Sequence, residues 1–138
     1  MHVTYTPEGG DAQRWDFNPG RVRSAEAELI EKRYGKAWDQ FRADVQTGTM
    51  KARRVLLWHL LRRDHHTLRF EDVPDFYTDE LLVEHSVDEL TVMRDKLAQA
   101  DLPDGDRDQM LAMLDIELAE AAARGEVPEG KAPSSSAA

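Results

Sequence analysis

The residues of this 138-residue chain that can carry chemistry are its five histidines and its paired carboxylates. The one histidine cluster, His65-His66, follows Asp64, and adjacent side chains point in different directions, so at most weak metal binding is expected there. Carboxylate pairs such as Glu71-Asp72 lack the apolar sequence context that raises a pKa for acid catalysis. A solvated acidic face is the favoured interpretation. The absence of cysteine excludes thiolate ligands, cysteine nucleophiles and disulfides.

Nucleotide-binding and hydrolase motifs are also absent from the sequence. There is no GxGxxG, GxxxxGK[ST] or GxSxG pattern. Ser24 and Ser86, the only serines before residue 134, are better explained as helix caps than as nucleophiles. The sequence therefore predicts a protein that is not an enzyme, with no catalytic residues, no cofactor and no metal site.

Composition and charge narrow the class of protein further. The chain is 41% hydrophobic and 33% charged, which suits one modest core. The net charge of −9 is uneven, because residues 24–63 carry +4 and residues 64–89 carry −8. This pattern favours self-complementary packing over a polarised surface that steers a partner, and it disfavours general nucleic-acid binding. No apolar stretch is long enough to span a bilayer, and the start lacks a signal-peptide pattern, so a cytoplasmic protein is expected.

Apolar periodicity predicts a mainly α fold, a compact bundle of about five helices. A small β-hairpin is expected over residues 1–18, where Val3 and Tyr5 alternate with polar residues, and a single helical domain continues to residue 125. Residues 126–138 are rich in proline, serine and alanine and are predicted to be a disordered tail.

Local signals predict where the helices begin and end. Ser24 is expected to cap a first helix that ends at Gly35, and a second helix ends at Gly48. An acidic stretch, residues 68–77, is predicted to dock on the helices as an extended segment. A third helix is predicted over residues 50–63, capped by Thr49. A fourth helix is opened by the capping box Ser86-Val87-Asp88-Glu89 and turns Leu90, Met93 and Leu97 inward. The last helix runs from Asp106 to about Arg124, and its inward residues are Met110, Leu111, Leu114, Leu118 and Ala121.

The helix over residues 50–63 is apolar nearly all round. Val55, Leu56 and Leu60 cover one side, while Leu57, Trp58 and Leu61 cover much of the other. Such a helix is either central to the core, which is the favoured interpretation, or buries its second face against a partner. In the second case Leu57, Trp58, Leu61 and the adjacent Arg62 are the candidate partner-binding residues.

Arginine pairs flank this helix and leave two further classes to consider. Arg53-Arg54 and Arg62-Arg63 are compatible with a small DNA-binding regulator, but the surrounding turns lack helix-turn-helix spacing. The basic residues are scattered around the helix, so they do not form the single face that membrane attachment requires. Neither nucleic acid nor membrane is therefore expected as a partner.

Several segments resemble a known family. These are the run from Trp15 to Pro19, the runs Ser24–Glu31 and Tyr34–Phe41, the run Ala52–Arg63, and Leu68–Val73. They look like the small tail assembly chaperones of long-tailed bacteriophages of actinobacterial hosts. The resemblance covers residues 13–76, about half of the chain, and includes no catalytic signature.

The resemblance implies a role and a partner. Members of this family bind the long, largely helical tape measure protein in the host cytoplasm, keep it soluble during tail tube assembly, and are absent from the mature virion. The family is commonly made as a short form and a longer, frameshifted form, and Glu129-Gly130-Lys131 permits a slippery heptamer. Expected partners are thus the tape measure protein, the longer form and possible further copies of this chain. The alternative function is a structural virion protein, such as a head–tail connector or minor tail protein.

Overall fold

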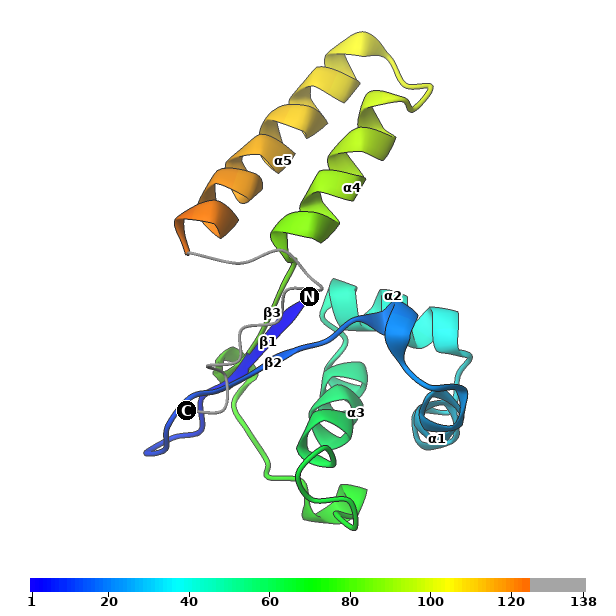
Figure 1. Ribbon diagram of the computed structural model, residues 1–138, viewed down its shortest axis with the longest axis vertical. Coiled ribbons are helices and arrows are strands. Elements are labelled where there is room, and N and C mark those ends of the chain that lie inside the picture. Colours follow the sequence, from blue (N-terminus) through cyan, green and yellow to red (C-terminus); the bar gives the residue numbers. More distant parts are fainter. Residues whose placement is uncertain (125–138) are drawn as a thin grey trace. The chain divides into compact units, whose positions relative to one another are not determined.

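The computed structural model describes residues 1–124, which are mainly helical, as the sequence predicts (Figure 1). The predicted tail over residues 126–138 lies outside the described residues. Three one-turn 3₁₀ helices, η1 to η3, accompany the longer elements. In chain order the elements are β1 His2–Tyr5, β2 Gln13–Asp16, η1 Pro19–Arg21, α1 Ser24–Tyr34, α2 Trp38–Thr47, α3 Met50–Leu61, η2 Phe70–Asp72, η3 Thr78–Glu80, β3 Leu81–Glu84, α4 Val87–Ala98 and α5 Asp104–Ala123.

The described chain divides into two compact units. The larger, called here the N-terminal unit, contains residues 3–83. The other, the C-terminal unit, contains residues 1–2 together with residues 84–124. The sequence-based expectation of a single domain over residues 1–125 stays a prediction.

The N-terminal hairpin is confirmed and belongs to a three-stranded antiparallel sheet. The strand order is β2-β1-β3, so β1 is the central strand and buries Val3 and Tyr5. The hairpin turn contains Gly9 at φ +71°, a backbone conformation that glycine adopts without a steric penalty. Strand β3 was not predicted, because its sequence Leu-Leu-Val-Glu shows no alternation of apolar and polar residues.

The helix ends follow local signals in part. Gly35 and Gly48 end α1 and α2 in the left-handed conformation, at φ +84° and +93°, as predicted. The predicted Ser24 cap is wrong, because Ser24 is already the first helical residue and Arg23 occupies the cap position without a side-chain bond. Thr49 does occupy the cap position of α3, but its side chain accepts no capping hydrogen bond.

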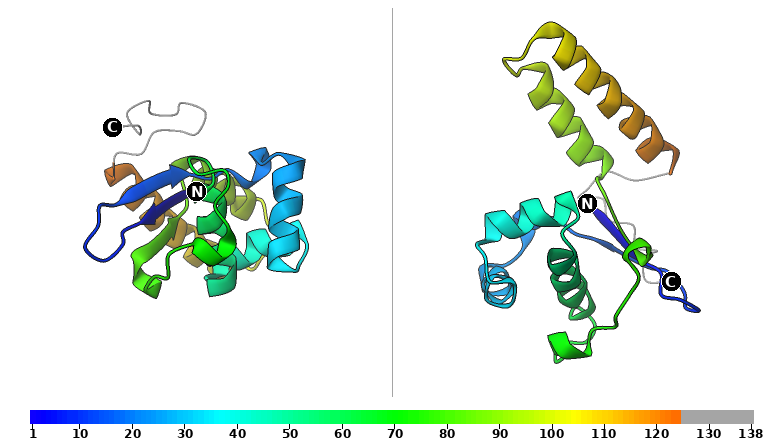
Figure 2. Two further views of the ribbon diagram at one scale, coloured as in Figure 1. Left: turned by 90° about the horizontal axis from the view of Figure 1, so that it is seen from below. Right: turned by 180° about the vertical axis from the view of Figure 1, so that it is seen from behind.

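Helices α1, α2 and α3 pack against one another and enclose the core of the N-terminal unit (Figure 2). The Tyr34 ring meets Phe41 edge-on at 5.4 Å, and its hydroxyl donates to the Asp44 carboxylate. Burial and this bond raise the pKa of Tyr34 to about 12. The fully buried side chains of these helices are Ile30, Phe41, Val45, Ala52, Val55, Leu56, Leu57 and Leu60.

The acidic segment after α3 runs across the helices largely as predicted, with one 3₁₀ turn. Val73 is buried, and Phe70 is half-buried beneath the guanidinium groups of Arg33 and Arg54, at 4.8 and 5.2 Å from its ring centre. Arg33 also forms an ion pair with Glu71 at 3.3 Å. This pair joins the basic and acidic stretches of the sequence within one unit.

The C-terminal unit is built on α4 and α5, which lie side by side and antiparallel (Figures 1 and 2). The predicted capping box is confirmed: Ser86 Oγ accepts from the Glu89 N–H at 3.1 Å, and the Glu89 carboxylate accepts from the Ser86 N–H at 2.9 Å. That carboxylate also pairs with the N-terminal ammonium of Met1 at 2.6 Å. Burial alone would raise the pKa of Glu89, but these hydrogen bonds hold it below its usual value.

None of the helices within residues 1–124 combines the length and the apolar character needed to cross a membrane.

Candidate functional site

The four partner-binding residues predicted from the sequence lie at the end of α3. Leu57 is fully buried, Trp58 is 8% exposed, and Leu61 and Arg62 are half-buried. The Trp58 indole donates to the carbonyl of Leu68 at 3.0 Å, so its polar edge is satisfied inside the N-terminal unit. The second face of α3 is therefore covered by this chain itself, as the favoured interpretation expected. Leu57 and Trp58 have little surface left for a partner.

Large exposed apolar side chains gather instead on the helices of the C-terminal unit. Methionine predominates among them, and their exposed fractions range from 40% to 60%. We call the following four residues the methionine face: Met93 of α4 and Met110, Met113 and Ile116 of α5.

Helical geometry places the three methionines of this face on the same side of the helix pair. Leu90 and Leu97 turn inward on α4. Each residue of a helix is rotated about 100° from the one before it, so Met93 lies about 60° around the helix axis from Leu90, on the side toward which one step back along the chain also rotates. On α5, Met110 and Met113 each precede an inward leucine by one residue and are rotated in the same sense. In an antiparallel pair, rotations in the same sense from the contact line point to the same side, and those on α5 are the larger, about 100° from the following leucine. Ile116 continues the α5 stripe farther around the helix.

An ion pair occupies the opposite edge of the pair. Arg94 Nε lies 2.6 Å from Asp115 Oδ1, and both residues are rotated from the contact line in the sense opposite to the methionines. The hydrogen bond from Arg94 lowers the pKa of the Asp115 carboxyl. One edge of the pair thus carries this ion pair, while the other presents the flexible apolar side chains of the methionines, with Glu117 one turn after Met113 on the same side of α5.

Two inward positions predicted from the sequence are corrected here. Met93 and Met110 were expected in the apolar stripes of their helices, but they are 40% and 48% exposed. A two-helix pair covers only one stripe on each helix, and Leu90, Leu111 and Leu114 fill it. The signal for a second stripe was present in the spacing of three residues from Met110 to Met113 and Ile116.

The methionine face contains no group suited to acid–base or nucleophilic chemistry, so what it offers is apolar binding. Within residues 1–124, no three histidine, aspartate or glutamate side chains gather as a metal ion requires. In comparisons with known proteins, no family model, no curated protein and no solved structure matches the chain.

Proposed function

We propose that this protein is a bacteriophage tail assembly chaperone that binds the tape measure protein and keeps it soluble while the tail tube assembles. The proposal draws on the sequence resemblance over residues 13–76 and on one structural observation, the methionine face of α4 and α5. A long protein with exposed apolar helical stripes needs many weak and reversible covers. The methionine face has the character of such a cover.

Two antiparallel helices with an apolar edge form a receptor for a third helix. An amphipathic helix laid along the edge would bury apolar residues at spacings of three and four, as helix-in-groove complexes do. Exposed fractions of 40–60% leave much of each side chain available for burial. The contact proposed here is Met93, Met110 and Met113, with Ile116 at its margin, in place of the sequence-based candidates Leu57, Trp58, Leu61 and Arg62.

Methionine suits a chaperone that meets many similar segments of one partner. Its unbranched, polarizable side chain changes rotamer readily, so one surface repacks around stripes of different shape. Acidic residues of α5 away from this face, such as Asp108 and Glu120, are exposed and would keep the complex soluble.

Co-expression with the tape measure protein of the same phage tests the proposal. The full chain should retain the tape measure protein in the soluble fraction and co-purify with it, whereas Met113→Glu should weaken both at unchanged helical circular dichroism. The matched control is Ala112→Glu, which adds the same charge at an exposed neighbouring position on the other side of α5. Equal retention by Met113→Glu and by the unmodified chain would contradict the assigned face.

Mass spectrometry of purified virions separates the chaperone from the structural alternative. A chaperone of this class should be missing from the particle, whereas a head–tail connector or minor tail protein should be present in it. Finding the chain at the stoichiometry of a structural subunit would overturn the proposal.

The gene provides a further test. We expect a slippery heptamer at the codons of Glu129-Gly130-Lys131. We also expect an overlapping −1 reading frame there, just upstream of a very long gene. If neither the overlap nor the long gene exists, the connector becomes the better interpretation.

A further inference from the structure

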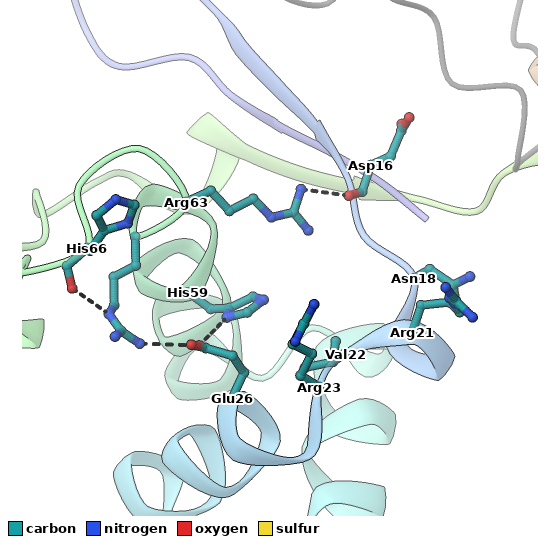
Figure 3. Close-up of a pocket in the computed structure, with 10 residues that line it drawn as sticks. Asp16, Asn18, Arg21, Val22, Arg23, Glu26, His59, Arg63 and His66 are labelled. Carbon is teal, nitrogen blue, oxygen red and sulfur yellow. Dashed lines mark hydrogen bonds and ion pairs between the residues drawn. The ribbon is translucent and has the colours of Figure 1, made fainter.

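A basic pocket in the N-terminal unit lies between the start of α1 and the end of α3 (Figure 3). Its volume is about 510 Å³, within the range of small-molecule sites. Four arginines and two histidines line it, together with two carboxylates and two uncharged residues. The lining residues are Arg21, Arg23, Arg62, Arg63, His59, His66, Asp16, Glu26, Asn18 and Val22.

His59 is the buried polar group of the pocket. It is 8% exposed, and its buried Nδ1 has no hydrogen-bond partner among the described residues. The Glu26 carboxylate comes only to 3.6 Å from that nitrogen. Burial and the charges of Arg63 and Arg62 lower the pKa of His59 against the opposing effect of Glu26, which favours the neutral imidazole. The Nδ1 atom thus has one long contact with Glu26, drawn as a dashed line in Figure 3, and keeps the capacity for a shorter hydrogen bond to a polar ligand in the pocket.

The arginines have donors to spare. Arg62 donates to Glu26 and to the carbonyl of His66, both at 3.3 Å. Arg63 donates to the carbonyl of Asp16 at 3.0 Å (Figure 3). Each guanidinium has five N–H groups, so most of them stay available. Arg21 and Arg23 are exposed, and no described residue forms an ion pair or side-chain hydrogen bond with either guanidinium.

The start of α1 adds backbone donors. Arg23 stands at the cap position, and no side chain caps the free N–H groups of the first turn. The N-terminal end of a helix carries partial positive charge and receives anions. Arg23 at the cap position and Glu26 in the first turn both line the pocket, so the start of α1 forms part of its wall and adds partial positive charge beside the arginines.

We propose that this pocket binds a phosphate group, either as the free ion or as a small phosphate monoester. Four guanidinium groups against two carboxylates leave a surplus of two positive charges, which matches a dianion. The planar fork of arginine pairs with phosphate oxygens through two parallel hydrogen bonds. The cavity is larger than a phosphate ion, so a small organic group fits beside it. This site is independent of the methionine face and of the proposed chaperone function.

Isothermal titration of the full chain tests the site with two probes, sodium phosphate and glycerol phosphate, at ionic strength held constant with chloride. If both probes bind saturably, one to one and with equal affinity, the phosphate ion alone accounts for the binding. If glycerol phosphate binds more tightly, the ligand of the pocket is a phosphate monoester. Absence of saturable binding of either probe at millimolar concentrations overturns the proposal.

Arg23→Gln should weaken binding about tenfold or more, as expected for the loss of a charge-assisted hydrogen bond. Arg21→Gln is a second exposed variant, which keeps the test valid if the first one fails to fold. Arg42→Gln on α2 is the matched control, since Arg42 is exposed and lies outside the pocket, beside Asp39. Equal weakening by Arg42→Gln and Arg23→Gln would show a general charge effect and reject the site. All three variants should retain the tape measure protein, which separates this test from that of the chaperone function.

Discussion

Helices α3 and α5 make an instructive comparison, because both carry apolar residues around much of their circumference and only one of them is buried. In α3, seven of twelve residues are buried, from Ala52 to Leu60. In α5, which has twenty residues, only Ala121 is buried. An apolar sequence alone therefore does not make a helix a core helix.

The difference lies in the number of neighbours each helix has within its own unit. Helix α3 contacts α1 and α2, and the segment after it covers the remaining side through Leu68 and Phe70. Helix α5 packs on α4, and a single neighbour can cover only one stripe. The uncovered apolar surface of α5 is what a partner would bury, so the comparison connects packing to the proposed function.

The largest expected effect distinguishes buried from exposed apolar side chains. Leu57→Ala should lower the free energy of unfolding by about 2–5 kcal/mol, since it removes a fully buried side chain and leaves a cavity. Met113→Ala, at a 60% exposed position, should change it by less than about 0.5 kcal/mol. Urea denaturation followed by circular dichroism measures both. If Leu57→Ala lowers the free energy of unfolding by less than about 1 kcal/mol, α3 is not the buried helix of the two compared here, α3 and α5.

A smaller effect should separate the two serines that the sequence suggested as helix caps. Ser86→Ala should cost about 1 kcal/mol, because the Ser86 hydroxyl oxygen accepts from the Glu89 N–H and belongs to a complete capping box. Ser24→Ala should be nearly neutral, since Ser24 lies inside the first turn of α1 and the helix has no side-chain cap. Equal losses for both, measured by urea denaturation, would contradict the assigned start of α1.

The smallest expected effect concerns pH and the end of α3. The pKa of His59 is lowered in the folded chain by burial and by Arg63, so the unfolded chain binds more protons between the folded pKa and the ordinary value near 6.5. Folding stability should therefore be fully present above about pH 6.5 and should decrease as the pH falls toward the folded pKa.

Denaturation at pH 7.5 and 5.5 measures this contribution. His59→Gln should reduce the difference in unfolding free energy between the two pH values. His66→Gln, at an exposed position, serves as the control and should leave the difference unchanged. If His66→Gln removed the pH dependence and His59→Gln did not, the assigned titrating group would be wrong.

The sequence by itself determined the features that depend on the nearest residues. Gly35 and Gly48 end their helices because the left-handed conformation carries little steric cost for glycine. The pattern Ser86-Val87-Asp88-Glu89 begins α4 because both partners of the reciprocal bonds lie within three residues. The apolar circumference of α3 favoured a central place in the core, but by itself it did not exclude a partner on the second face of the helix.

Only the tertiary structure decided the features that need distant residues. Strand β3 exists because Leu81–Glu84 pairs with β1, nearly eighty residues earlier in the chain, and its local pattern carries no strand signal. Met93 and Met110 are exposed because α4 and α5 have room for one shared stripe, which is set by how the two helices meet. The pocket gathers Asp16, Arg23 and His59 from three separate segments. Helix caps and helix ends depend on hydrogen bonds and backbone conformations of residues close together in the sequence, so they are encoded locally. The burial of a side chain and the gathering of distant residues in one pocket depend on which surfaces the folded chain brings together.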